Sequence, residues 1–373
     1  MVLKNIFYYF TFLFLLLGCL SPHKFSKITT SPKNVIFLIS DGAGLSQISS
    51  AFFYKDSSVN YSRFKNIGLI HTFSSDNDIT DSAASATAFS TGEKTYNGAI
   101  GVSDDFKPLE NITEIASKKG VKVGLVSTSS VTHATPATFY AHTKSRNFQE
   151  EIALQLSKSE IDYFAGGGTK FFNQRNDGIN LLDTLNLNGF NVNTNELDSF
   201  VNVKKDEKLA YLLASDGMPK IIEGRGHFLK NATILGIDFL RQENNPFFII
   251  SEGAQIDWAG HDNDANYLIT ELIDFDNTIG AVLDFAENDG ETLVIVTSDH
   301  ETGGFTLAGK PFINHYAEID EDYSTILPSF STDGHSATLI PVFAFGPGAE
   351  EFSGVYDNTE IFHKILKLTS WNK

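Results

Sequence analysis

The chain of 373 residues is poor in three features, each of which would define a class of protein. It contains a single cysteine, which excludes an intramolecular disulfide framework and any zinc or iron–sulfur site built from several cysteines. It has 28 basic residues against 46 acidic ones, and the basic residues form no cluster, so we expect no nucleic acid as a partner. It has one long apolar run, where a polytopic membrane protein has several. Its 42% hydrophobic residues are those of a globular chain.

The apolar run and the cysteine lie together at the N-terminus. Lys4 precedes about 12 apolar residues, which is typical of a secretory signal peptide and too short for a membrane span. The run ends in LLGC at positions 16–19, which resembles a bacterial lipobox, where cleavage before the cysteine leaves its thiol to carry a lipid anchor. The alternative is an ordinary signal peptide with an incidental Cys19. We expect a lipoprotein signal peptide over residues 1–18, a lipid-anchored polar tether over 19–33, and a location at the bacterial cell envelope, periplasmic or on the outer membrane.

Strand-like and helix-like patterns alternate along the rest of the chain. Short runs rich in Val, Ile and Phe occur at Asn34–Ser40, Val121–Ser127, Pro246–Ser251, Thr292–Ser298 and Pro341–Phe345. Helical patterns lie between them at Leu109–Lys119, Asn147–Ser157, Ala232–Gln242 and Ala265–Glu287. This alternation predicts an α/β fold with a doubly wound, mostly parallel central sheet flanked by helices. The pattern leaves open whether a domain boundary lies within residues 170–230. Residues 59–75 are expected to form a peripheral segment.

Polar residues follow four of the predicted strands. They are Asp41, the segment Thr128–Pro136, Glu252, and the pair Asp299 and His300. Ligands of open α/β sheets bind beyond the carboxyl ends of the strands, so these positions are candidates for a site. Each carboxylate taken singly has the alternative role of capping the next helix. Four strand ends of this kind together favour a functional site.

A second group of residues has the chemistry and spacing of metal ligands. Asp257 and His261 are four residues apart, which places them on one side of a helical turn. Asp299 and His300 offer the same two ligand types side by side, and His335 adds another imidazole. Carboxylate oxygen and neutral imidazole nitrogen suit Zn²⁺ and related divalent ions. A lone histidine is usually an ordinary surface or core residue, so the prediction depends on the grouping.

A third feature is the alanine-rich stretch DSAASATAFSTG at residues 81–92. It predicts a helix whose first turn presents the Ser82 hydroxyl beside free backbone amides and the positive end of the helix dipole. A phosphate can bind at such a position and a serine can attack it. The alternative is that Ser82 only caps the helix.

These motifs, taken in order, resemble those of the alkaline phosphatases. The matching segments are FLISDGAG, DSAASATAFSTG, THATPA, AHTKSR, SEGAQIDWAGH, TSDHETGG and the late DGH, which together span residues 34–345. The resemblance implies a metal-dependent hydrolase that converts phosphate monoesters to alcohol and phosphate. It also implies an alkaline phosphatase-like catalytic domain over residues 34–373. The DSAASATA segment and the combined ligand set are the most specific parts of the match.

The resemblance assigns three metal sites, two for Zn²⁺ and one that holds Mg²⁺ in many members of the family. One zinc would be held by Asp257, His261 and His335. The second would be held by Asp41, Asp299 and His300, with Ser82 as its remaining ligand. The third ion would lie on Asp41, Thr135 and Glu252. Four carboxylates and one arginine, with three divalent ions, give a positive pocket that attracts a phosphate dianion.

Two further residues complete the implied substrate site. Arg146, in AHTKSR, would bind two phosphate oxygens while Asp81 orients its guanidinium. An isolated arginine would more often be a solvated helix residue. In the implied mechanism Ser82 attacks phosphorus, and the phosphoserine that forms is hydrolysed by water.

At two positions the chain departs from one branch of the family. That branch has Asp where this chain has His133, and Lys where it has Trp258. His133 could bind the third ion directly or through water and shift its preference from Mg²⁺ toward Zn²⁺ or Co²⁺. Because Trp258 lacks the positive charge of a lysine, we expect phosphate to bind more weakly than in that branch. The alternative is that Trp258 only packs against its neighbours. Only 34 residues separate His300 from His335, which predicts a small crown-type insertion, an open site and a broad substrate range.

Two other functions compete with the monoesterase. One is a phosphodiesterase or phosphonate hydrolase of the same superfamily. Such enzymes usually use two metals and lack the third site, so Glu252, Thr135 and Arg146 favour the monoesterase. The other is a non-catalytic lipoprotein that binds phosphate or zinc, which would not need Ser82. The expected partners are small phosphomonoesters, the membrane through the lipid anchor, and a second copy of the chain in a homodimer, because dimers are common among similar proteins.

Overall fold

A ten-stranded sheet organises the chain in the computed structural model, which describes residues 31–198 and 207–371. From one edge to the other its strands are β14 (Gly354–Asp357), β2 (Asn66–His71), β13 (Ile340–Phe345), β8 (Thr292–Thr297), β1 (Asn34–Ile39), β7 (Phe247–Glu252), β3 (Lys122–Ser130), β4 (Tyr163–Gly167), β6 (Lys208–Leu212) and β5 (Phe190–Asn193). Every neighbouring pair is parallel except the two made by β13, which pairs antiparallel with β2 and β8. The prediction of an α/β fold with a mostly parallel sheet is confirmed.

The central strand β1 shows why its sequence is apolar throughout. It lies between β7 and β8, with Val35 opposite Phe248 on one side and Leu293 on the other. Successive side chains of a strand point to opposite faces of the sheet. Phe37 and its alternate neighbours therefore enter the core on one face, while Leu38 enters the core on the other. A sheet buried on both faces needs apolar residues at every position of its central strands.

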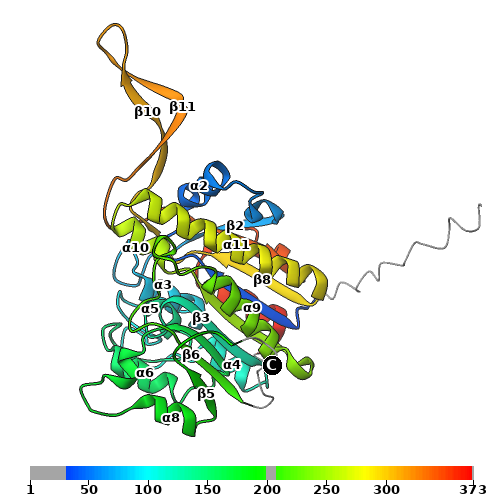
Figure 1. Cartoon of the computed structure of the whole chain (residues 1–373). Coiled ribbons are helices and arrows are strands. Elements are labelled where there is room, and N and C mark those ends of the chain that lie inside the picture. Colours follow the sequence, from blue (N-terminus) through cyan, green and yellow to red (C-terminus); the bar gives the residue numbers. More distant parts are fainter. Residues whose placement is uncertain (1–30, 199–206, 372–373) are drawn as a thin grey trace, which may run out of the picture.

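Two layers of helices cover the sheet (Figure 1). One layer packs on one core with α2 (Leu45–Tyr54), α9 (Phe228–Leu240), α10 (Gln255–His261) and α11 (Ala265–Asp289). The other packs on the opposite core with α3 (Ser82–Thr91), α4 (Ile112–Ser117), α5 (Ala134–Ala137), α6 (Gln149–Leu156), α7 (Lys170–Asn173), α8 (Leu181–Leu187) and α12 (Glu360–Thr369). Short 3₁₀ turns are η1 (Asn60–Arg63), η3 (Ile221–Glu223), η4 (Gln242–Asn244) and η5 (Ala349–Phe352). The predicted helices correspond to α4, α6, α9 and α11.

Strand pairing corrects two expectations from the sequence and resolves one possibility that it left open. The run at 341–345, expected to be parallel, is the antiparallel strand β13. Residues 59–75, expected to be peripheral, contribute β2 to the main sheet, where it pairs with β13 and β14. Residues 170–230 hold no domain boundary in their described part, because β5 and β6 continue the same sheet beside β4. Pairing between strands that lie far apart in sequence decides all three.

The segment between His300 and His335 forms a projecting hairpin. Its strands are β10 (Thr306–Ile313) and β11 (Ile319–Ser329), paired antiparallel. The hairpin extends away from the body of the molecule beside α2 (Figure 1), and it is mostly exposed. At its base two short strands, β9 (Glu301–Thr302) and β12 (His335–Ser336), pair with each other. The hairpin is therefore the insertion predicted between the two histidines.

The N-terminal predictions fall largely outside the described residues. These are the signal peptide over 1–18, the anchor at Cys19 and most of the tether over 19–33. Over residues 31–198 and 207–371 the structure has no helix that is both long enough and apolar enough to span a membrane.

Candidate metal-binding active site

Three carboxylates meet at the carboxyl edge of the sheet. Asp41 follows β1, Asp299 follows β8 and Glu252 ends β7, and all three are fully buried. Since β1 pairs with both β7 and β8, these strand ends are neighbours. Burying three carboxylates together is costly unless cations compensate their charge.

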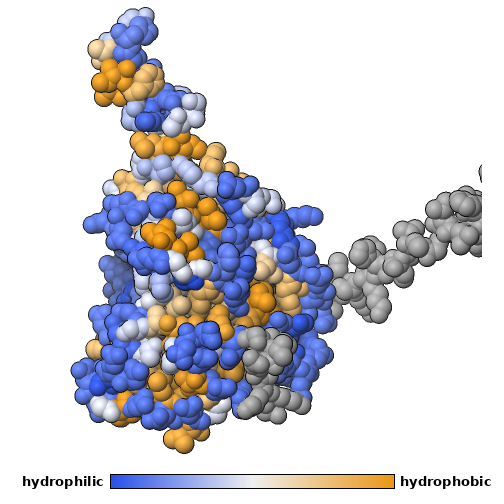
Figure 2. Space-filling view, viewed as in Figure 1, coloured by the Kyte–Doolittle hydropathy of each residue, from blue (hydrophilic) through white to orange (hydrophobic). Residues whose placement is uncertain are grey.

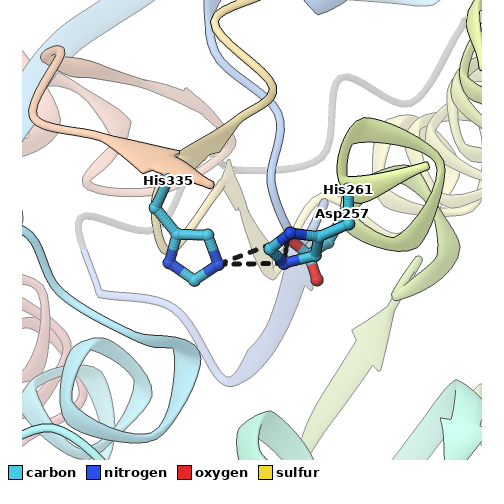
Figure 3. Close-up of side chains that lie close together, drawn as sticks. All are labelled: Asp257, His261 and His335. Atoms are coloured by element: carbon cyan, nitrogen blue, oxygen red, sulfur yellow. Dashed lines mark hydrogen bonds and ion pairs between the residues drawn. The ribbon is translucent and has the colours of Figure 1, made fainter. Parts of the chain in front are cut away.

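The first of three ligand-type groups consists of Asp257, His261 and His335 (Figure 3). Asp257 and His261 come from α10, while His335 comes from β12. The Nε2 atoms of the two histidines are 3.2 Å apart, and they lie 3.4 Å (His261) and 3.7 Å (His335) from Asp257 Oδ1. The helical spacing predicted for Asp257 and His261 is present, and the fold brings His335 to them from far along the chain.

Hydrogen bonds outside this group fix the direction of both imidazoles. His261 Nδ1 lies 2.5 Å from the Asp333 carbonyl oxygen, and His335 Nδ1 lies 2.8 Å from the Thr80 carbonyl oxygen. A carbonyl oxygen only accepts, so each Nδ1 carries a proton, and in the neutral ring, which is the form that binds metal, Nε2 presents a lone pair to the group. Two Nε2 atoms that lie 3.2 Å apart beside a carboxylate form an arrangement that a divalent cation fits.

The second group consists of Asp41, Asp299 and His300, all fully buried. His300 Nε2 lies 3.6 Å from Asp41 Oδ1 and 3.4 Å from Asp299 Oδ2. The Ser82 hydroxyl is 3.2 Å from the same nitrogen. The nucleophile candidate from α3 therefore faces this group directly.

The electrostatics of the second group favour a bound cation. Burial, with Asp299 nearby, raises the pKa of Asp41 well above its usual range, and burial also raises the pKa of Asp299. Burial lowers the pKa of His300 well below its usual range, so its imidazole is neutral. Both carboxylate oxygens of Asp41 and Oδ2 of Asp299 are buried without a hydrogen-bond partner. Unpartnered carboxylate oxygens beside a neutral imidazole suit a divalent metal ion, whose charge would replace the protons.

A third group combines Asp41, His133 and Glu252. The Oε1 atom of Glu252 and the nearby hydroxyl of Thr135 are buried without a hydrogen-bond partner. Burial raises the pKa of Glu252 to about 7. Burial, with Arg146 close by, lowers the pKa of His133 to about 3, so this histidine stays neutral. Oxygen-rich donors of this kind suit a hard ion such as Mg²⁺, and His133 adds a nitrogen donor.

The nucleophile candidate and the arginine are linked through Asp81. Asp81 caps α3, with Oδ1 accepting from the Ala84 amide at 3.0 Å, and its Oδ2 accepts from Arg146 Nη1 at 2.9 Å. Ser82 is thus the first residue of the helix rather than its cap. All ten residues of α3 are buried, which explains a sequence of small side chains without a polar face. The local sequence positions the hydroxyl, and the cap positions the guanidinium beside it.

Trp258 packs at the edge of the third group. Its ring lies 5.9 Å from the His133 ring in an edge-on arrangement. A Cβ atom on Gly217 would come within 2.5 Å of the indole, so the close packing requires glycine there. Trp258 therefore has a packing role, and it also lies next to a residue of the candidate site.

Several residues around the site were not singled out from the sequence. Ser127 and Ser129 donate to Glu252 Oε2, and the polar run that ends β3 was the one available indication. The Thr80 and Asp333 carbonyls, which orient the histidines, leave no sequence pattern. Thr302 lies between the first and second groups, within the motif TSDHETGG. Such contacts depend on which loops the fold brings together.

The sheet, the serine at a helix start and the three ligand-type groups define a metal-binding hydrolase. The family model for alkaline phosphatase matches residues 32–327. Alkaline phosphatase 3 of Bacillus subtilis is 33% identical over 417 aligned residues, covering 91% of this chain and 89% of that protein. The alkaline phosphatase of the Antarctic bacterium TAB5 is 57% identical, with a TM-score of 0.90, over 93% of this chain and 100% of that one. A histidine-to-aspartate variant of that enzyme, solved with Mg bound in one of its metal sites, gives a TM-score of 0.91.

The chain belongs to the alkaline phosphatase family. It is a phosphomonoester hydrolase that works with metal cofactors, and the resemblance first noticed in its motifs is confirmed. Phosphomonoesters are its substrates.

Proposed function

We propose that this enzyme hydrolyses a broad range of phosphomonoesters through a covalent phosphoserine on Ser82. The observation that carries this proposal is the position of the Ser82 hydroxyl. It lies 3.2 Å from His300 Nε2 at the start of a buried helix, beside an arginine held by the helix cap. A non-catalytic phosphate binder would not need a hydroxyl there.

Two zinc ions and one magnesium ion are proposed as the cofactors. Asp257, His261 and His335 would hold one zinc, and Asp41, Asp299 and His300 the other, with Ser82 beside it. Asp41, Glu252 and Thr135 would hold magnesium, and His133 could favour Zn²⁺ or Co²⁺ there. When bound, such ions lower the pKa of a hydroxyl and neutralise the negative charge on phosphate oxygens. The unpartnered buried oxygens of Asp41, Asp299, Glu252 and Thr135 support these assignments.

The chain's own groups then divide the reaction into two displacements. Ser82 Oγ, after losing its proton to solvent, attacks phosphorus while the bond from phosphorus to the alcohol oxygen breaks. The alcohol departs on the opposite side and takes a proton from water. Water attacks the phosphoserine from the vacated side and gives up a proton to solvent, the bond from phosphorus to Oγ breaks, Oγ takes a proton from solvent, and phosphate leaves. Arg146 holds two non-bridging oxygens through both steps, and Asp81 keeps its guanidinium in place.

Substitution of the serine tests the proposal. Purified Ser82→Ala protein with full metal content should form no phosphoenzyme when mixed with p-nitrophenyl phosphate at acidic pH, whereas the wild type should. Turnover of the variant at the wild-type rate would refute the covalent route. Faster hydrolysis of bis-p-nitrophenyl phosphate than of the monoester by the wild type would instead favour a phosphodiesterase as the main activity.

The enzyme is also proposed to be a lipoprotein of the bacterial cell envelope, anchored through Cys19. The lipobox-like sequence supports this, and the placement of the described chain is compatible with it. The described chain enters the sheet at Asn34, whereas Asp41 follows the other end of β1, so the first residue of that strand and the site lie at its opposite ends. A Cys19→Ala variant should lose incorporation of labelled palmitate and appear in the soluble fraction. Labelling equal to that of the wild type would contradict the anchor.

A homodimer is proposed as the working form. Exposed apolar side chains on the hairpin support it: Ile313 is 75% exposed, and Ile319 and Tyr323 are each 83% exposed. Phe52 and Phe53 on α2, which contacts the hairpin strand β10, are also exposed, and Figure 2 shows hydrophobic residues along this projection. Analytical ultracentrifugation should give a dimer for the wild type and a monomer when the three hairpin residues are replaced by serine. A monomeric wild type would contradict the proposal.

A further inference from the structure

Thr302 in β9 contacts one ligand-type residue of the first group and one of the second group while belonging to neither. Its hydroxyl oxygen lies 2.5 Å from Asp257 Oδ1 in the first group and 3.2 Å from His300 Nδ1 in the second. The residue is fully buried. One hydroxyl therefore joins the two groups through direct hydrogen bonds.

The chemistry of the partners determines the direction of both hydrogen bonds. As a metal ligand Asp257 is in its ionised form, whose oxygens only accept, so the single hydroxyl proton of Thr302 is donated to Asp257. The oxygen of Thr302 must then accept from His300, which places the proton of the imidazole on Nδ1. The Nε2 atom of His300 is left with a free lone pair, directed at the Ser82 hydroxyl and the two carboxylates of its group.

His300 differs in this respect from the histidines of the first group. His261 and His335 both donate to backbone carbonyls, which are acceptors whatever else happens in the site. His300 instead depends on a hydroxyl whose direction is set by Asp257, a residue of the other group. The position of the proton on His300 in the second group is thus linked, through Thr302, to Asp257 in the first group.

The surroundings hold Thr302 firmly in this position. Its amide donates to the Gly42 carbonyl at 3.0 Å, and its carbonyl accepts from Gln47 Nε2 at 2.9 Å. A Cβ atom on Gly42 would lie 2.9 Å from the Thr302 hydroxyl, and one on Gly260 would lie 3.0 Å from Thr302 Cβ. Glycine at both positions lets the three segments pack closely. The threonine therefore has little freedom to turn its hydroxyl elsewhere.

We propose that Thr302 is a positioning residue that couples metal binding at the two groups. This inference rests on the metal sites proposed above. An ion on the first group fixes Asp257, Asp257 fixes the hydroxyl, and the hydroxyl keeps the Nε2 lone pair of His300 ready for the second ion. Without the hydroxyl, Nδ1–H of His300 would be a buried donor without a partner, so the proton moves to Nε2, where the carboxylates can accept it. The second ion would then have to displace that proton.

Two variants of nearly the same shape separate the hydroxyl from the methyl group. In Thr302→Val the zinc held by the second group should bind about 10- to 100-fold more weakly than in the wild type, which is the usual effect of losing a partner of a histidine ligand. In Thr302→Ser the affinity should stay near that of the wild type. Thr278→Val is the matched control, since Thr278 is equally buried and its hydroxyl bonds only within α11. The measurement is the equilibrium transfer of zinc from the loaded full-length protein to a competing chelator.

A second readout needs no variant at Thr302. Nitrogen-15 NMR of the wild type, assigned with His300→Asn, should show the proton of His300 on Nδ1 both with and without metal. A proton on Nε2 in the metal-free wild type would overturn the proposal. So would wild-type zinc affinity of both groups in Thr302→Val, or equal weakening in Thr302→Ser. A wild type that binds no zinc would instead refute the metal sites themselves.

Discussion

Removal of the metal ions should make the stability of this enzyme depend on pH. Asp41, Asp299 and Glu252 are fully buried, and burial raises the pKa of each. In the metal-free protein each therefore keeps a proton at a pH where the unfolded chain has released it. Folding is favoured by bound protons of this kind, so the contribution of these three carboxylates to the free energy of unfolding falls as the pH rises. His133 and His300, which burial keeps neutral, contribute in the opposite direction as the pH rises through about 6.5.

The size of the effect can be worked out for Glu252. Its pKa is about 7 in the folded protein against 4.5 in the unfolded chain. One pKa unit is 1.36 kcal/mol, so the protonated form contributes about 3 kcal/mol, fully present below pH 4.5 and lost as the pH rises through 7. About 2 kcal/mol of this lies between pH 5.5 and pH 8. Asp41 and Asp299 act in the same direction.

Denaturant unfolding at pH 5.5 and pH 8 provides the test. His133 and His300, whose pKa values burial lowers, gain stability over the same range, so the contribution of Glu252 is isolated by comparing two chelator-treated proteins, the wild type and Glu252→Gln. Glu252→Gln cannot titrate at this position, so its metal-free form should lose about 2 kcal/mol less than the wild type. The same change in stability between pH 5.5 and pH 8 for the metal-free wild type and for metal-free Glu252→Gln would refute the reasoning.

Two further predictions concern the phosphate pocket. Arg146→Lys keeps the charge but loses the paired donors, so kcat/KM for p-nitrophenyl phosphate should fall about 10- to 100-fold; a fall of less than twofold would contradict the proposed clamp. Trp258→Lys adds a cation near His133, so inorganic phosphate should inhibit about tenfold more strongly, by one charge-assisted hydrogen bond. Trp258→Phe is the control for this variant. An unchanged inhibition constant for phosphate in Trp258→Lys would show that the residue at position 258 has a packing role only.

Much of the fold could be read from local patterns. Apolar runs marked the central strands, because a strand buried on both faces needs apolar residues throughout. The same patterns could not show that β13 runs antiparallel or that β2 joins the sheet. Strand direction depends on partners distant in the sequence, and β2 alternates buried with partly exposed residues, which weakens its pattern. Strand β5, at the edge of the sheet, and its neighbour β6 were missed for the related reason that their segment is rich in polar residues.

The sequence by itself determined the chemistry available to this protein: which side chains could bind metal, which serine could attack and which arginine could bind phosphate. Those residue types stand in short motifs, and their order identifies the family. Only the tertiary structure decided how they work together. It brought His335 to α10, aimed the Ser82 hydroxyl at His300 and set Thr302 between two groups of ligands. A hydrogen bond depends on tenths of an ångström between atoms hundreds of residues apart, and the packing of the whole sheet fixes that distance.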